Sequence, residues 1–192
     1  MIFHRVLIIE EVHNKEDEKP GSTDSKLTPG TSGTGAVTLT SIVTNGKAYT
    51  VGGQTYKVTK VASGGSPGTV TFTKAKNAKN ITVPATVKLE DGNTYQVTQV
   101  GAKAFTGKKI RKVTVGANVK KLAKGAFSKS KATTVILKTK KLGKAGVKGS
   151  LKGSKVSKIQ VKVGAKKVNK KFVKSYKKIF TKKNVGIKVS VK

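Results

Sequence analysis

The residues of this sequence that could do chemistry are mainly lysines, which crowd the predicted turns and could bind anions. The chain carries 41 lysine and arginine residues against 8 aspartate and glutamate residues, a net charge of +33. Lysine acts as a hydrated point charge, whereas arginine makes the forked contacts that read phosphate and guanine. Because only Arg5 and Arg111 are arginines, the composition favours diffuse attraction to a polyanion over base reading. A solvated lysine face that binds nothing is the alternative. The candidate contacts are Lys108, Lys109, Arg111, Lys112, Lys120 and Lys121.

The sequence lacks the residue sets that catalysis or metal binding requires. The two histidines, His4 and His13, lie near the start of the chain, and cysteine is absent, whereas a zinc site needs several convergent ligands. The only carboxylates after residue 24 are Glu90 and Asp91. They are adjacent in a predicted hairpin tip, so their side chains point to opposite faces and make a poor acid–base pair. We therefore predict a non-enzymatic protein with no cofactor and no metal.

The first part of the chain is predicted to be a tether. Residues 1–12 hold one short apolar stretch, and residues 13–35 combine charges with Gly, Ser, Thr and Pro. Such a composition cannot bury enough apolar surface to fold, so residues 1–35 are predicted to be a disordered segment and linker. No run approaches the roughly 20 apolar residues that span a bilayer. The apolar start is too short for a secretory signal, which is either absent or encoded upstream in a longer chain.

Short strand-like segments recur through the second half of the sequence. They start at Ile81, Val113, Val135 and Ile159, with spacings of 32, 22 and 24 residues. Eight positions before each of the last three strands stands a bulky apolar residue, preceded by a small one. These pairs are Ala104-Phe105, Ala126-Phe127 and Ser150-Leu151. A period of this length with one short strand per unit indicates stacked repeats that share one core.

The alternation within each strand predicts which side chains face the core. The first and third residues of a strand point to the same side, and here they are apolar. The middle residues Thr114, Ile136 and Gln160 are therefore predicted to face outward. The bulky residue before each strand fills the space between the strand and the returning chain, and its small neighbour permits close packing.

Residues 36–80 are predicted to form a β-rich N-terminal cap. Gly52 and Gly53 separate two alternating segments, as in a hairpin with a tight turn. The segment that runs from Gly53 to Val61 is closely similar to the one from Gly92 to Val100, so both are predicted to adopt the same turn and strand. A second hairpin at 88–96 explains why the first strand spacing is longer than the others.

The C-terminal residues are predicted to cap the last repeat. Apolar residues recur at helical spacing over 169–181, with lysines on the opposite face and Asn169 as the predicted N-cap. An alternating segment at 187–191 is predicted to be a final strand. Because the last repeat of such an array needs cover, residues 168–192 are interpreted as a C-terminal cap.

The motifs VTVGANVKKLAKGAF and QVTQVGAKAFTGKKIRK, with the lysine-rich end, resemble the BspA-type leucine-rich repeats of bacterial cell-surface proteins. The resemblance covers about residues 81–192 and extends less closely over 49–80. Many family members have a cysteine after the Phe, where this sequence has Thr106 and Ser128. The resemblance implies an extracellular or wall-associated display module, often adhesive, without catalytic residues.

The predicted fold is therefore a β-rich, leucine-rich-repeat-like solenoid with short parallel strands, a β-hairpin N-terminal region and a C-terminal capping helix plus strand. Its regions are the segment 1–35, the cap 36–80, the solenoid 81–167 and the C-terminal cap 168–192.

The predicted function is a monomeric, non-enzymatic adhesion module at the cell surface or outside the cell. It would present its lysine-rich repeats to a protein or glycan ligand on host or neighbouring cells. One alternative is electrostatic binding of polyanions such as wall teichoic acid, sulfated glycan or nucleic acid. Specific nucleic-acid binding would need exposed aromatic platforms, and the repeat aromatics are predicted to lie in the core. Another alternative is a structural spacer without a ligand.

Overall fold

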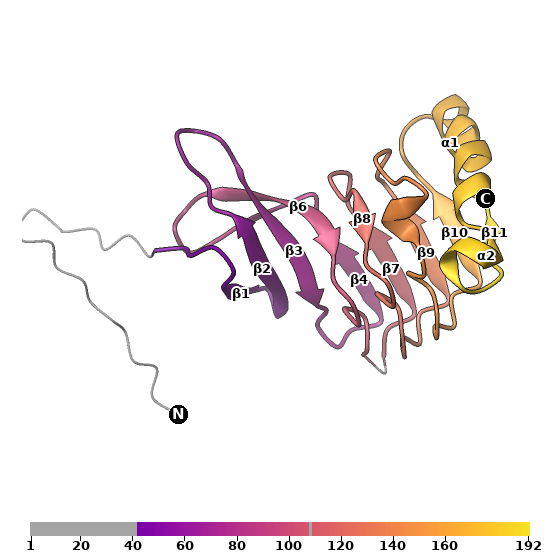
Figure 1. Cartoon of the computed structure of the whole chain (residues 1–192), viewed down its shortest axis with the longest axis horizontal. Helices are drawn as coiled ribbons and strands as arrows, with labels where there is room; N and C mark the ends of the chain where they lie inside the picture. The colour runs from indigo at the N-terminus through magenta and orange to yellow at the C-terminus, as the bar shows by residue number, and fades with distance from the viewer. Residues whose placement is uncertain (1–41, 108) are drawn as a thin grey trace, which may run out of the picture. The chain divides into compact units, whose positions relative to one another are not determined.

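The computed structural model describes residues 42–107 and 109–192 of the chain. The predicted linker 1–35, with His4 and His13, lies outside the described residues, as does Lys108. The described residues are rich in β-structure, with two sheets and a helical C-terminal region (Figure 1).

The N-terminal half of the described region builds a mixed sheet. The strands of this sheet are, in order, β1 (Ala48–Val51), β2 (Gln54–Lys60), β3 (Gly68–Lys74), β6 (Thr94–Val100) and β5 (Thr86–Lys88), with β8 (Lys121–Leu122) paired to β6. Hairpin neighbours β1/β2, β2/β3 and β5/β6 are antiparallel. The pairs β3/β6 and β6/β8 are parallel and join segments that are distant in the sequence.

Two glycine turns start the two similar segments of this sheet. Gly52 and Gly53 have φ angles of 57° and 74°, and positive φ at both central residues is what a two-residue type I′ hairpin requires. Gly92, before β6, has a φ angle of 75°. The following strands each bury one tyrosine at the matching position, Tyr56 in β2 and Tyr95 in β6. The predicted hairpins are confirmed, and the two segments form matching strands. Their turns differ, because β1 and β2 are joined by two residues and β5 and β6 by the longer turn from Leu89 to Asn93, so the predicted common turn is wrong.

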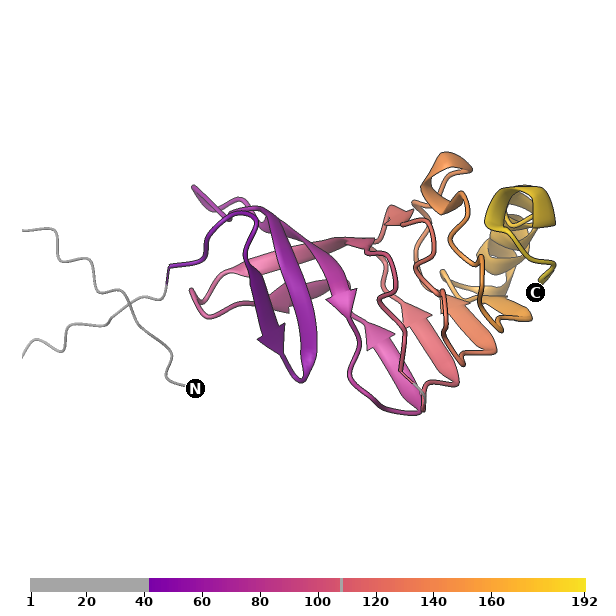
Figure 2. The ribbon, with the colours of Figure 1, turned by 60° about the horizontal axis from the view of Figure 1, so that its bottom comes forward.

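The repeated strands form a second, parallel sheet. Its order is β11 (Ser190–Val191), β10 (Lys158–Val161), β9 (Thr134–Leu137), β7 (Lys112–Val115) and β4 (Asn80–Val83), and the arrows lie side by side in Figure 2. Ile81 pairs with Val113, Val113 with Val135, and Val135 with Ile159. The four strand starts predicted from the spacing are therefore aligned in register.

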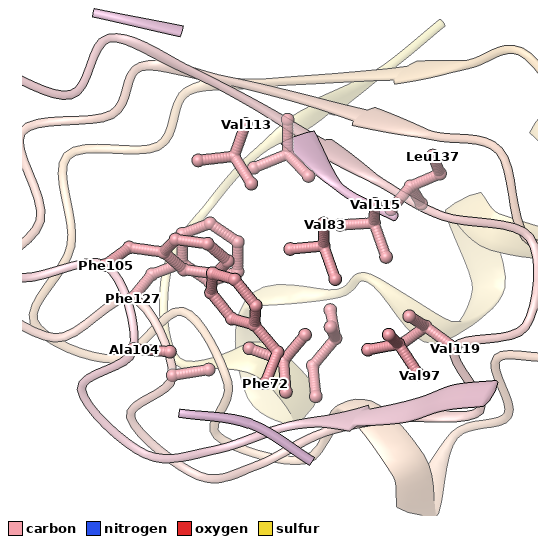
Figure 3. Packing of buried hydrophobic residues seen from close by; sticks show 14 of the residues in the cluster. Phe72, Val83, Val97, Ala104, Phe105, Val113, Val115, Val119, Phe127 and Leu137 are labelled. Carbon is pink, nitrogen blue, oxygen red and sulfur yellow. The ribbon is translucent and has the colours of Figure 1, made fainter. Parts of the chain in front are cut away.

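The inward residues of both sheets belong to one buried cluster. A row of aromatic rings runs through it: the centroid distances are 5.6 Å from Tyr56 to Phe72, 5.5 Å from Phe72 to Phe105 and 4.5 Å from Phe105 to Phe127. Figure 3 shows the last three rings together, with Ala104 beside them. Burying one such ring contributes about 1.5–3 kcal/mol to folding. Packing thus accounts for the fact that the Ala-Phe pair is repeated at a fixed spacing within this chain.

The helical region differs from its prediction at both ends. Besides the 3₁₀ turn η1 (Ala145–Val147), the described helices are α1 (Lys166–Ile179) and α2 (Lys182–Val185). Helix α1 begins at Lys166 with Ala165 as N-cap, so the prediction of Asn169 as N-cap is wrong. The predicted helix over 169–181 is present, but it runs over 166–179. The Asn169 side-chain oxygen instead accepts hydrogen bonds from the backbone N–H groups of Val163 and Gly164, at 2.8 and 3.1 Å. These bonds hold the chain just before the helix.

The final strand is also shorter than predicted. Only Ser190 and Val191 of the segment 187–191 pair with β10. Helix α2 ends at Val185 and is capped by Gly186. The φ angle of Gly186 is 98°, the left-handed conformation that glycine adopts without strain. The chain must leave this turn before it reaches the edge of the sheet, so Ile187 and Val189 pack against the core without pairing.

Candidate functional site

The predicted anion contacts are divided between the two sheets. Lys109, Arg111 and Lys112 lie at the start of β7, whereas Lys120 and Lys121 lie at β8. All five side chains are exposed. Because both strands direct apolar residues into the common core, the two groups of charges lie on different sides of it. The structure therefore does not bring the predicted set together as one site.

The outer face of the parallel sheet forms one candidate surface. Thr82, Thr114, Ile136 and Gln160 are register neighbours on β4, β7, β9 and β10. Thr82 is exposed and the other three are half-buried, whereas the residues on either side of each one in its strand are buried and apolar. The predicted outward direction of Thr114, Ile136 and Gln160 is confirmed. The row presents hydroxyl and amide groups that can both donate and accept hydrogen bonds, beside one apolar side chain. We call this row the outer face.

A second candidate surface is a groove of about 720 Å³ that we call the lysine groove. It is lined by Lys121, Lys124, Lys148, Lys152 and Lys183. Its other lining residues are Leu122, Ala123, Ala145, Gly149, Asn184 and Gly186. The lysines come from β8 and the loop after it, from the loop around η1, and from α2. Lysines up to 62 positions apart in the sequence thus meet in one groove.

A ladder of backbone hydrogen bonds holds the three segments of this groove. The Lys103 N–H donates to the Gly125 carbonyl at 3.0 Å, and the Gly125 N–H donates to the Gly149 carbonyl at 2.9 Å. The Gly149 N–H continues the ladder to the Asn184 carbonyl at 2.6 Å. Positions 103, 125 and 149 have φ angles of 55°, 67° and 64°, so each repeat makes the same left-handed turn here. The repeat therefore fixes the spacing of Lys124 and Lys148, which flank these turns.

No acidic side chain offsets this charge within the groove. The described residues that line it include no aspartate or glutamate, and the sequence from residue 92 to the end contains none. Clefts lined by charge of one sign focus the electric field and raise the local concentration of counter-ions. The charge of the groove therefore favours anions over cations.

The carboxylates of the described region have a structural role in the β5–β6 hairpin. Asp91 accepts hydrogen bonds from the Tyr95 hydroxyl at 2.7 Å and from the backbone and side-chain nitrogens of Asn93 at 3.0 and 3.1 Å. Partial desolvation raises the pKa of Asp91, but these hydrogen bonds together lower it by more, so the net shift of the pKa is downward. An ionised aspartate that accepts three bonds holds the turn, while its neighbour Glu90 is exposed.

The described residues contain neither a metal-binding cluster nor a membrane-spanning helix. Within residues 42–107 and 109–192, no group of three or more histidine, cysteine or acidic side chains could hold a metal ion. In the same part of the chain, no helix has the length and hydropathy needed to cross a membrane. A polar hollow of about 490 Å³ lies between the loops at 62–67 and 92–94. None of the residues that line it has a titratable side chain.

The lysine groove was not predicted from the sequence, although one signal pointed to it. Lys124 and Lys148 are 24 residues apart, the same spacing as between Phe127 and Leu151. Aligning charged positions by the repeat would have placed these two lysines on neighbouring units. The contribution of Lys183 has no such signal, because it follows a helix that interrupts the repeat.

The comparisons with known proteins give one structural likeness. No family model and no curated protein matches the chain. The chain is similar to the crystal structure of the pneumococcal vaccine antigen PcpA, with 26% sequence identity and a TM-score of 0.41. The match covers 62% of this chain and 30% of that chain, so it spans less than a third of the antigen.

Proposed function

We propose that the chain is a non-enzymatic interaction module of a bacterial cell surface, built from BspA-type leucine-rich repeats stacked as a solenoid. The observation that carries this proposal is the outer face. Four strands align in register, and the repeat positions that pack the core are separate from those that face outward. A scaffold of this kind presents a broad row of side chains to a protein or glycan on a neighbouring cell.

The cellular location can be tested by surface shaving. Intact cells of the producing strain would be treated briefly with a protease, and the released peptides identified by mass spectrometry. The proposal expects peptides from residues 42–192 in the released fraction, together with known surface proteins and without cytoplasmic markers. Peptides of this chain found only after cell lysis would contradict it.

A second candidate function is the binding of polyanions, and the lysine groove favours it. Five lysines converge on one groove whose described lining has no carboxylate. Nucleic acid fits this candidate poorly, because Phe105 and Phe127 are fully buried and cannot act as stacking platforms. A spacer without any ligand would need neither the groove nor the outer face.

A further inference from the structure

We propose that the lysine groove binds a linear phosphodiester polymer with a polyol backbone, of the kind represented by a chain of glycerol phosphate units. The inference rests on the second candidate function and assigns it a site and a ligand class. It concerns Lys124, Lys148, Lys152 and Lys183, which the sequence did not single out, together with Lys121.

The first argument is the electrostatic arrangement of the groove. The backbone ladder stacks neighbouring segments at roughly the spacing of paired strands, about 4.8 Å. The backbones of neighbouring segments are therefore closer than the Debye length of about 8 Å at physiological salt, so the charges that these segments carry are not fully screened from one another. Binding a chain with several negative charges relieves this repulsion at every lysine. A single small anion would satisfy only part of the groove.

The second argument is the type of cation. Lysine engages an anion as a point charge from any direction, and the groove contains no arginine fork. A phosphodiester carries one negative charge per unit, and a polyol backbone turns easily between units. Such a ligand can bring successive charges to separate ammonium groups without a fixed geometry. The site recognises the number and spacing of charges.

The third argument is what lines the groove between the lysines. Leu122, Ala123, Ala145 and Gly149 are small or apolar, and the described lining contains no aromatic ring. Bases stack on aromatic side chains, so the groove lacks the platforms that a nucleic acid would use. Small apolar residues and the lysine stems can instead contact the methylene groups of a polyol. This combination favours a phosphodiester chain without flat rings.

The test uses the full chain and a fluorescently labelled poly(glycerol phosphate) of defined length, with binding followed by anisotropy. If five lysines take part, the affinity should fall about 100-fold between 50 and 200 mM salt, a log–log slope of about −3.5. The triple variant Lys124→Gln, Lys148→Gln and Lys152→Gln should bind at least about 10-fold more weakly, with a slope nearer −1.5. The corresponding triple Lys→Arg variant should retain binding, which separates charge from folding.

A charge-matched control makes the test specific to the groove. Lys109, Lys112 and Lys131 are exposed and lie outside the groove lining, so their triple Gln variant should bind within about 3-fold of the unchanged protein. Equal losses in the two triple Gln variants would overturn the groove while leaving diffuse polyanion binding intact. No binding of any polyanion by the unchanged protein would overturn the second candidate function too. Tighter binding of heparin or of single-stranded oligothymidine through the same lysines would overturn the assigned ligand class.

Discussion

The ring centroids of Phe105 and Phe127 lie 4.5 Å apart, with an angle of 30° between the ring planes. The two residues occupy the same position in successive repeats, 22 residues apart. The contact between neighbouring repeats is therefore made by identical side chains, and the next repeat replaces the ring with Leu151, which is also buried. The alignment of the four parallel strands and this contact have one cause, which is the stacking of similar units.

The first prediction concerns the stability supplied by this stack. Phe127→Ala removes a fully buried ring between Phe105 and the next repeat, and it should lower the free energy of unfolding by about 3–5 kcal/mol. Phe127→Leu should cost less, about 1–2 kcal/mol, because leucine occupies the same position in the next repeat. Urea unfolding followed by circular dichroism measures both. A cost below about 1 kcal/mol for Phe127→Ala would show that the ring stack is not the source of the stability.

The second prediction concerns Ser150, which stands where the other repeats have Ala104 and Ala126. Its side chain is fully buried, and its hydroxyl oxygen has no hydrogen-bond partner within the described part of the chain. A buried hydroxyl without a partner costs about 1–3 kcal/mol, so Ser150→Ala should stabilise the protein by about 1 kcal/mol. The matched reverse change, Ala126→Ser, should destabilise it. A drop in stability for Ser150→Ala, measured by urea unfolding, would refute the argument.

The third prediction concerns the attachment of helix α1 and its response to pH. The Tyr176 hydroxyl donates to the Thr139 carbonyl at 2.6 Å, and burial raises the pKa of Tyr176 to about 12. The folded state therefore holds this proton more tightly than the unfolded state, whose tyrosines have a pKa near 10. The stabilising contribution is complete below pH 10 and is lost as the pH rises from about 10 to 12.

Thermal unfolding between pH 8 and pH 11.5 measures this contribution. Tyr176→Phe should melt at a lower temperature than the unchanged protein at pH 8, because the hydrogen bond is lost, and the difference should shrink as the pH rises above 10. The pKa values of Tyr56 and Tyr95 are also raised by burial, but both proteins retain these residues. Parallel melting curves across the whole pH range would contradict the role of Tyr176.

The spacing of apolar residues predicted much of the fold because packing in this chain is periodic. The starts of β4, β7, β9 and β10 follow from the positions of residues such as Phe105 and Phe127, since each strand must bury its alternate side chains against the same core. The parallel pairing of β6 with β3 was not predicted, because it joins segments outside the repeat spacing. The pairing of β6 with β8 was not predicted either, although Val100 and Leu122 are 22 residues apart, the same spacing as Phe105 and Phe127.

Local signals were less reliable near the C-terminus and at the surface. Asn169 has the residue type of an N-cap, yet its side chain bonds to the backbone at Val163 and Gly164 from within the helix. The lysine groove depends on the stacking of three segments, so neither its lysines nor its shape follow from any one stretch of sequence. Charges in a repeat are best assessed after the units have been aligned.

The proposal of a surface interaction module is tested most directly by binding to whole cells. The fluorescently labelled chain would be incubated at 150 mM salt with cells of the producing strain and with cultured epithelial cells, and bound label measured by flow cytometry. The double variant Thr114→Glu and Ile136→Glu alters the outer face, whereas Thr50→Glu, on exposed strand β1, is the control. We predict saturable binding to one of the two cell types that the double variant reduces at least about 10-fold and the control leaves unchanged, the size expected when central contacts of an interface are lost. Binding that is absent from both cell types, or is equal for all three proteins, would contradict the proposal.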